Sequence, residues 1–306
     1  MKTIRIATRK SKLALWQAEW VKAKLEESGL TAALHAIDTT GDKVLDVAIS
    51  KIGSKGVFTE ELEELLAKGE VDIAVHSAKD MASTLPDGFE LIAFGERAAH
   101  TDVLVSNKAI DLQSDLLIGT SSTRRVAQLA RLFPHIKTVA VRGNLQTRMQ
   151  KMEDGVCDAL LLAKAGVDRL GLSSQIVREF SVDELTPAAG QGSIAIEAHE
   201  SIHPTIRKLI RAAVNDPVAE KCIKCERAFL KKLEGGCSIP VFAFASLVGD
   251  KIQLKAGLLS IDGSEFLEET ATGENPVELG TTIAEKILNQ GGDRILSGIK
   301  KQLGYL

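Results

Sequence analysis

Short apolar runs alternate with helical patterns along the first two thirds of the chain. Residues 4–8 are typical of a buried strand, and Leu13, Trp16, Trp20 and Ala23 follow at steps of three and four, which predicts one apolar helix face. Strands separated by helices favour mainly parallel sheets covered on both faces. The same patterns predict a helix over residues 58–68 and further strands over residues 71–75, 116–119, 138–141, 158–162 and 193–197.

The pattern changes at about Pro217. One helical stretch, residues 218–233, leads into Gly235-Gly236-Cys237. Strands that are grouped together and then followed by helices indicate a smaller α+β domain. Its predicted strands are residues 241–248, 252–260 and 266–272, and its closing helices are residues 277–289 and 293–302.

Length and composition describe an ordinary globular protein. At 306 residues, of which 44% are apolar and 26% charged, the chain has room for two or three domains. The net charge of -3 gives no global case for binding nucleic acid or an acidic membrane. Any anion site must therefore come from a local concentration of Arg and Lys.

The expected compartment follows from the same sequence. No run reaches the ~18 apolar residues of a membrane span, and the first residues lack the apolar centre of a signal peptide. We therefore expect a cytoplasmic protein. Its four cysteines should then be thiols unless chemistry recruits one of them.

Basic residues gather in three Gly- and Ser-containing turns that follow predicted strands. The turns are residues 9–12 (RKSK), residues 119–125 (GTSSTRR) and residues 142–148 (RGNLQTR). Ser or Thr in such a turn can cap a helix whose free N–H groups attract an anion, and Arg presents a planar fork to carboxylate or phosphate. A single cluster could be a set of solvated surface charges. Three at equivalent positions favour a polyanion site.

The segment His76-Ser77-Ala78-Lys79-Asp80 directly follows the strand predicted over residues 71–75. Ligands of such sheets gather at the carboxyl ends of strands, where Asp80 could donate a proton or stabilise a cation. A Lys-Asp pair after a strand is also a common turn. For His76, a structural role is the better interpretation than a metal ligand.

The cysteines leave two alternatives open. Cys222-x-x-Cys225 with Cys237 superficially resembles a metal or redox set. However, the first two lie in a helical pattern, and no fourth ligand has suitable spacing, since His199 and His203 precede a predicted helix. Packing is therefore the favoured role for Cys222 and Cys225. Cys237 follows two glycines in a turn, where an exposed thiol can react.

Taken together, these segments resemble the hydroxymethylbilane synthase (porphobilinogen deaminase) family along nearly the whole chain. Eight matching segments in the same order make a chance resemblance improbable. They are IATRKSKLALWQA, TTGDKVLD, KIGSKGVFTEELE, DIAVHSAKD, GTSSTRR, VRGNLQTR, PAAGQG and ERAFLKKLEGGCSIP.

The resemblance implies a fold of three domains. Two related doubly wound α/β domains, similar to periplasmic solute-binding proteins, would flank a cleft, and a smaller C-terminal α+β domain would carry the cofactor cysteine. In this sequence the first domain would span residues 1–95 with 193–211, the second residues 96–192 and the third residues 217–306.

The resemblance also assigns roles to individual residues. Cys237 matches the cysteine that binds a dipyrromethane cofactor through a thioether, and Asp80 matches the catalytic aspartate. Lys55 and Phe58 match a mobile loop. Residues implied to bind the cofactor are Ser77, Lys79, Thr120, Ser121, Ser122, Arg124, Arg125, Arg142 and Gly143, and residues implied to bind substrate are Arg9, Ser11, Arg148, Arg169 and Gln191.

The implied reaction is the stepwise joining of four porphobilinogens on the covalent dipyrromethane primer, followed by hydrolytic release of the linear tetrapyrrole for porphyrin and haem biosynthesis. Several arginines suit this chemistry because every ring carries two carboxylates, and a carboxylate suits the cation left by loss of ammonia. The resemblance implies no metal or nucleotide. We expect porphobilinogen as the small-molecule partner of a monomer, without nucleic acid or membrane.

The sequence departs from the usual family pattern at Ser54, Ala82, residues 98–101 (AAHT) and Ser238. The third departure, near the first interdomain crossing, puts the hinge geometry in question. An anion-binding or sensor protein is the main rival interpretation, because two α/β domains around a basic cleft also suit that class. It gives no role to Asp80 or to the Gly-Gly-Cys turn.

Overall fold

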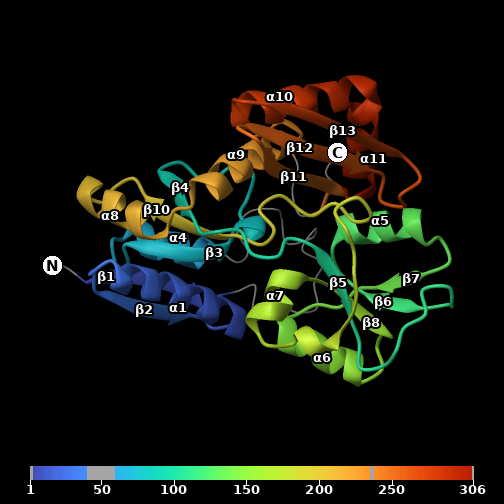
Figure 1. The fold of residues 1–306 in the computed structure, drawn as a ribbon, viewed down its shortest axis with the longest axis horizontal. Coiled ribbons are helices and arrows are strands. Elements are labelled where there is room, and N and C mark those ends of the chain that lie inside the picture. The colour runs from blue at the N-terminus through green and yellow to red at the C-terminus, as the bar shows by residue number, and fades with distance from the viewer. Residues whose placement is uncertain (1–2, 40–58, 235–237, 305–306) are drawn as a thin grey trace. The chain divides into compact units, whose positions relative to one another are not determined.

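The computed structural model describes residues 3–39, 59–234 and 238–304. The chain divides into two compact units, residues 1–98 with 192–220 and residues 99–191 with 221–306. One of the three sheets in the described residues belongs to the first unit and two belong to the second (Figure 1). The segments expected to form the second and third domains thus lie in one compact unit, although each has its own sheet.

The first unit is built on a five-stranded mixed sheet with the order β2-β1-β3-β10-β4. β1 (Ile4–Arg9) is parallel to both β2 (Ala32–Ile37) and β3 (Ile73–Ser77). β10 (Ile194–His199) enters between β3 and β4 (Phe89–Phe94) and is antiparallel to both. The first part of the chain therefore needs a strand that comes about a hundred residues later to complete its sheet.

Helices cover both faces of this sheet. α1 (Lys12–Glu27) and α8 (Pro204–Val214) pack on the face that carries Ile6, whereas α4 (Glu60–Ala67) packs on the face that carries Ala7. Successive side chains of a strand point to opposite faces, so buried strands with apolar residues on both faces require this double cover.

The second unit contains a sheet of similar design with the order β7-β6-β8-β5-β9. β6 (Leu117–Gly119) is parallel to β7 (Lys137–Val139) and β8 (Ala159–Ala163), and β5 (Asp102–Val105) is antiparallel to β8 and β9 (Ile176–Glu179). Three helices follow the parallel strands: α5 (Thr123–Leu132), α6 (Leu145–Glu153) and α7 (Lys164–Arg169).

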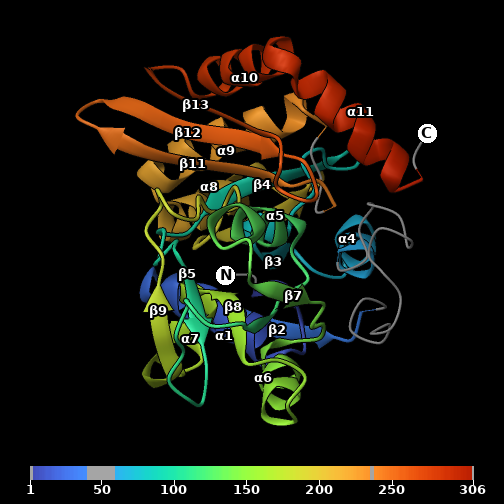
Figure 2. The same cartoon turned by 90° about the vertical axis from the view of Figure 1, so that its right-hand side faces the viewer.

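The C-terminal segment adds an antiparallel sheet, β11 (Val241–Val248), β12 (Lys251–Leu259) and β13 (Phe266–Gly273). Figure 2 shows α10 (Pro276–Ile287) lying along these strands. The main core of the segment joins the sheet to α9 (Pro217–Lys232), α10 and α11 (Asp293–Gln302).

α5 also contacts the C-terminal sheet. A small cluster joins Ala127 of α5 to Phe242 and Leu259, with Phe266 packed against it. The guanidinium of Arg131, also on α5, lies 4.2 Å from the centre of the Phe266 ring. One helix therefore packs against both sheets of the second unit.

The two larger sheets are mainly parallel, as expected, with one reversed strand in each, β10 in the first and β5 in the second. One strand boundary is corrected. β3 spans residues 73–77 rather than 71–75, and Asp72 just before it exchanges hydrogen bonds with Arg5 of β1. His76 and Ser77 are consequently strand residues, and the turn begins at Ala78.

In the part of the chain that the structure describes, no helix combines the length and the apolarity that crossing a bilayer requires.

Candidate active site

One group of predicted site residues lies at the edge of the first sheet. Arg9 ends β1, and Ser77 ends the neighbouring parallel strand β3. Because carboxyl ends of parallel neighbours share an edge, the turn after β3 and the start of α1 lie at that same edge. Ser11 caps α1 there by accepting a hydrogen bond from the Ala14 N–H at 3.3 Å.

Asp80 ends a single 3₁₀ turn that follows β3. Its side chain is exposed, whereas Ser77 and Lys79 are half-buried. The turn is fixed to β10, because the Ala78 N–H donates to the Ser193 carbonyl at 3.0 Å. Asp80 is therefore accessible to a ligand while its backbone is held by the sheet.

Gln17 is a neighbour of this edge that the sequence reasoning missed. It is buried on α1, and its Nε2 lies 2.9 Å from Oγ of Ser77. The amide fixes the hydroxyl at the end of β3.

The helix face predicted from Leu13, Trp16, Trp20 and Ala23 is wrong, because Trp16 and Ala23 are exposed and α1 instead buries Gln17, Ala18, Val21 and Leu25. The prediction missed Gln17 because it followed the large apolar residues.

His76 lies beneath the turn in the core. Its Nε2 is 3.0 Å from Oε2 of the fully buried Glu197 on β10. The described residues contain no group of three or more His, Cys, Asp or Glu side chains placed to hold a metal ion. The contact supports the structural role predicted for His76.

A second group of predicted residues lies at the edge of the β6–β8 sheet. Thr120, Ser121 and Ser122 follow β6, and the Ser122 hydroxyl caps α5 by accepting from the Arg125 N–H. Ser121 Oγ donates to the Val141 carbonyl at 3.0 Å. The hydroxyl-rich turn thus connects the ends of β6 and the segment after β7.

The turn between β7 and α6 carries Arg142 and Gly143. Gly143 has φ +110°, a conformation that side chains disfavour, and an added Cβ would lie 2.7 Å from Cγ2 of Thr147. Arg148 Nε donates to the Gly143 carbonyl at 2.8 Å. Glycine is therefore required here, and the turn brings its backbone and two arginines together.

Arg124 and Arg125 open α5, but both are buried. Their guanidinium groups meet the two oxygens of the fully buried Asp102, each through an Nη2 at 2.8 Å. Burial alone would raise the pKa of Asp102; attraction by the two arginines, with hydrogen bonds from Arg125 and Gln191, outweighs it and holds that pKa well below the usual range.

Two further predicted site residues are buried or half-buried rather than exposed at the surface. Gln191 is buried, and its Nε2 donates to the His100 carbonyl at 2.7 Å and to Asp102 Oδ1 at 3.0 Å. Arg169 ends α7, and burial lowers the pKa of its guanidinium to about 10, so it stays charged at neutral pH. A direct substrate contact remains a prediction for both. Lys55, Phe58 and Cys237 lie outside the described residues.

The remaining cysteines behave as packing residues. Cys222 and Cys225 are buried on α9 in the C-terminal core, as predicted, and neither forms a disulfide. Burial raises the pKa of Cys225 to about 12, so almost none of it is thiolate at neutral pH. A redox or metal role for this pair receives no support from its surroundings.

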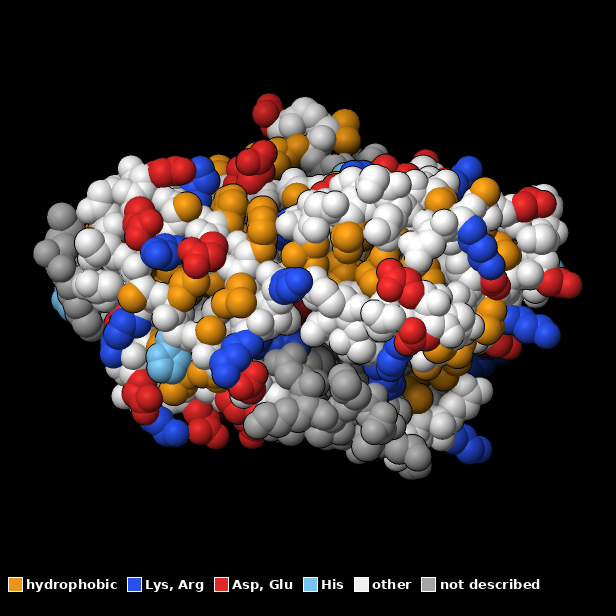
Figure 3. All heavy atoms as spheres, turned by 90° about the horizontal axis from the view of Figure 1, so that it is seen from below, with side chains coloured by type: hydrophobic (Ala, Val, Ile, Leu, Met, Phe, Trp, Pro, Cys, Tyr) orange, Lys and Arg blue, Asp and Glu red, His pale blue; other side chains and the backbone are white. Residues whose placement is uncertain are grey.

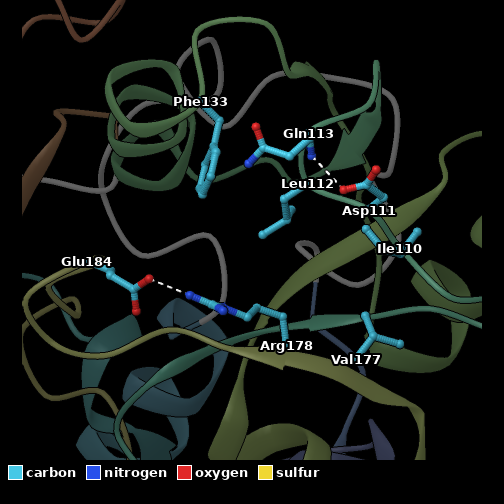
Figure 4. Close-up of a pocket in the computed structure, with 8 residues that line it drawn as sticks. All are labelled: Ile110, Asp111, Leu112, Gln113, Phe133, Val177, Arg178 and Glu184. Carbon is cyan, nitrogen blue, oxygen red and sulfur yellow. Dashed lines mark hydrogen bonds and ion pairs between the residues drawn. The ribbon is translucent and has the colours of Figure 1, made fainter.

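A surface pocket lies elsewhere on the second unit. Its volume is about 480 Å³, and Figure 4 shows Leu112, Gln113 and Phe133 facing the ion pair between Arg178 and Glu184. None of the predicted site residues that the structure describes lines it. The face in Figure 3 shows acidic and basic side chains interspersed, without one dominant charged patch. The basic groups of interest are local to the strand ends.

These features define an α/β protein whose strand ends are suited to binding a ligand with several carboxylates. Two mixed α/β sheets carry arginines and hydroxyls at strand ends, where helices begin, and a third, antiparallel sheet completes the chain. Such donors suit a ligand with several carboxylates.

Comparison with known proteins gives the family. The profile described as "Porphobilinogen deaminase, dipyromethane cofactor binding domain" matches residues 4–207, and that described as "Porphobilinogen deaminase, C-terminal domain" matches residues 220–289. The porphobilinogen deaminases of Desulfosudis oleivorans and Cytophaga hutchinsonii are 53% and 52% identical to this chain, over 98% and 99% of its length and 98% of theirs. The chain belongs to the porphobilinogen deaminase family.

The likeness to a solved structure is weaker. The VFT2 domain of Bordetella pertussis BvgS, a double mutant, aligns with a TM-score of 0.44 and 15% identity, covering 74% of this chain and 92% of that domain.

The described residues fit a dipyrromethane group. Its acetate and propionate side chains need cationic and hydroxyl donors, and the β6–α5 and β7–α6 turns supply both beside two helix amino termini. Because the close packing at Gly143 excludes a Cβ, no side chain at this position shields the backbone from a ligand. The arrangement suits carboxylates better than a metal or a nucleotide base.

Proposed function

We propose that this chain is a hydroxymethylbilane synthase, a transferase that joins four porphobilinogens into a linear tetrapyrrole for porphyrin and haem biosynthesis. The observation that carries the proposal is the family match along nearly the whole chain, at more than 50% identity to two porphobilinogen deaminases. The basic and hydroxyl side chains at two strand-end edges are consistent with a substrate that carries two carboxylates per ring.

Asp80 is the proposed catalytic residue. Its exposed carboxylate can accept hydrogen bonds from pyrrole N–H groups and lower the energy of the cation that forms when the aminomethyl group of the substrate loses ammonia. The 3₁₀ turn holds its backbone, and Lys79 and Ser77 are its neighbours at the edge. Asp80 thus stabilises charge that develops during the reaction.

The arginines are proposed to bind and orient. Arg9 and Ser11 at the first edge, with Arg142, Arg148 and Arg169 in the second unit, would pair with acetate and propionate groups. Fixing the reacting rings in register removes much of the entropic cost of joining them. When bound, dipyrromethane supplies the ring carbon to which the first substrate is joined. Cofactor contacts are proposed for Ser77, Lys79, Thr120, Ser121, Ser122, Arg124, Arg125, Arg142 and Gly143.

Cys237 is the proposed attachment point, through a thioether. The test is the intact mass of the denatured protein, measured on a preparation that converts porphobilinogen to tetrapyrrole. Wild-type protein should carry the added mass of two linked pyrroles, and Cys237→Ser should lack it. Cys222→Ser and Cys225→Ser are matched controls that should retain it. An unmodified mass on active wild-type protein would overturn the assignment.

We further propose that the enzyme acts in the cytoplasm as a monomer. Cys157, Cys222 and Cys225 are buried and form no disulfide, which is compatible with a reducing compartment. Light scattering of the purified enzyme at micromolar concentration tests the monomer, and fractionation of cells tests the compartment. A rival sensor or solute-binding function predicts saturable anion binding without product formation from porphobilinogen.

A further inference from the structure

Asp102 is placed by strand direction at the edge where the predicted cofactor ligands gather. It is the first residue of β5, which is antiparallel to β8, while β8 is parallel to β6. The start of β5 therefore lies at the edge where β6 and β8 end. This topology brings a fully buried carboxylate to the first turn of α5.

The carboxylate fixes two guanidinium groups at once. Arg125 approaches Oδ1 through Nη2 at 2.8 Å and Nε at 3.2 Å, and Arg124 approaches Oδ2 through Nη2 at 2.8 Å. Main-chain carbonyls hold each group from another side, since Nη1 of Arg124 donates to Thr186 at 2.8 Å and Nη1 of Arg125 donates to Leu161 at 3.0 Å. Neither group can rotate without breaking a buried contact.

Asp102 is itself held by the segment PAAGQG. Gln191 donates to it, and one residue earlier the Gly190 N–H donates to Oε2 of the fully buried Glu226 at 2.7 Å. The other oxygen of Glu226 accepts from the Ala245 N–H of β11 at 2.7 Å. A continuous buried network therefore runs from the arginine pair to α9, the helix that precedes Cys237 in the sequence.

The charges in direct contact do not cancel. Arg124 and Arg125 share the single carboxylate of Asp102, while the printed contacts of the Glu226 carboxylate are with the backbone N–H groups of Gly190 and Ala245. Desolvation of a charge is costly unless an opposite charge compensates it. A ligand carboxylate at the strand-end edge would supply such a charge.

We propose that Asp102 is a positioning residue, which orients Arg124 and Arg125 so that their surplus charge binds one carboxylate of the pyrrole primer. Gln191 supports Asp102 in this role, because its Nε2 donates to Oδ1 of Asp102. The proposal rests on the proposed function, because it takes the primer as the ligand. In this role Asp102 takes no part in the chemistry and touches no substrate; it acts only through the two arginines.

The test is primer assembly on the full-length protein without cofactor, produced in cells that make no porphobilinogen. Porphobilinogen is titrated against the wild-type protein and Asp102→Asn, and intact mass gives the fraction that carries the primer. Asp102→Asn should raise the half-saturating concentration at least tenfold, because the guanidinium groups lose their common anchor. If Asp102 only reduced the local positive charge, its loss would strengthen carboxylate binding and lower that concentration.

Other outcomes separate the alternatives. A purely structural role lowers the maximal fraction and leaves the half-saturating concentration unchanged, which overturns the proposal. If Asp102→Asn does not fold by circular dichroism, Gln191→Leu decides, with a smaller shift in the same direction expected and no shift overturning the proposal.

The matched control is Asp72→Asn, which breaks another two-point pair with an arginine, Arg5, in the first unit. It should leave the half-saturating concentration unchanged, and an equal shift in this control would also overturn the proposal. Absence of primer on wild-type protein refutes the proposed function itself, whereas normal primer assembly on Asp102→Asn refutes only the role of Asp102.

Discussion

Asp80 differs from the neighbouring site residues because its carboxylate is exposed at the end of a turn whose backbone is fixed. An exposed side chain contributes little to the core, so replacements should leave the fold intact. The chemical demands on this residue can therefore be separated from its structural ones.

Asp80→Asn keeps the shape of the side chain and removes the charge, whereas Asp80→Glu keeps the charge and moves it by about one methylene. If charge stabilisation dominates, Asn should be far worse than Glu, with turnover reduced roughly 10²–10³-fold, as for loss of an oxyanion donor. Single-turnover loading of porphobilinogen, counted ring by ring as intact mass, measures this. Near-normal loading by Asp80→Asn would assign the chemistry to another group.

Glu63 on α4 gives a pH-dependent prediction. Burial raises the pKa of its carboxyl, and the nearby Glu197 adds to this, while a hydrogen bond from Thr59 opposes it. The folded protein therefore binds this proton more tightly than the unfolded chain does. Its contribution to stability falls as pH rises from the ordinary value of 4.5 through the raised pKa.

Glu63→Gln removes that loss, so the variant should be more stable than wild-type protein at pH 7. The difference should shrink as pH falls to about 4, where the wild-type carboxyl is mostly protonated in both states. Urea unfolding at the two pH values measures it. A gain that is equal at both values would show that titration of Glu63 is not its cause.

Buried polar partners are what the sequence failed to predict at the residue scale. Arg124, Arg125 and Ser122 stand out because they follow a strand and open a helix. Nothing comparable marks Asp102, which begins a short apolar run, and only the antiparallel direction of β5 brings it to the same edge. Side-chain partners of this kind depend on strand order, which a local pattern does not contain.

At the scale of elements, strongly periodic segments were predicted within a few residues. The helix expected over residues 218–233 is α9, and the three C-terminal strands lie where expected. Strands β2, β4, β5 and β9 were not predicted. β2, β4 and β9 are edge strands, and β5 has only four residues. Neither the apolar pattern nor the length of these four strands distinguished them in the sequence.

α9 provides a test of the cysteine assignments. Cys222 and Cys225 are buried on it, and Cys157 is buried in the other sheet domain, where burial raises its pKa. Only thiolates react quickly with alkylating reagents. Native protein should therefore resist iodoacetamide at these three positions, whereas urea-unfolded protein should take up three labels.

The count depends on Cys237, because a thioether sulfur is not a thiol. A fourth label on an active preparation, after it is unfolded in urea, would contradict the thioether. Cys237→Ser should give the same count of three without the pyrrole mass, which separates the two readouts. Rapid labelling of Cys225 in the native state would contradict its burial in the helix core.

For the whole molecule, the order of motifs predicted more than any single motif did. Eight segments along the sequence indicated the family, and the α/β character followed from alternating patterns. Strand direction did not follow, since β5 and β10 enter their sheets after chain crossings that no local pattern records. At the altered crossing, the His100 ring stacks on Phe244 of β11 with centroids 4.3 Å apart, a contact that joins the crossing to the C-terminal sheet.

The position of β10 in the first sheet has a consequence for how the protein folds during its synthesis on the ribosome. Among the described strands, β10 is the one that pairs with β4, and it also covers the edge of β3. A ribosome must therefore complete the whole intervening domain before the amino-terminal sheet can close. Until residue 199 emerges, the nascent chain presents two open strand edges, which favour aggregation and recruit chaperones.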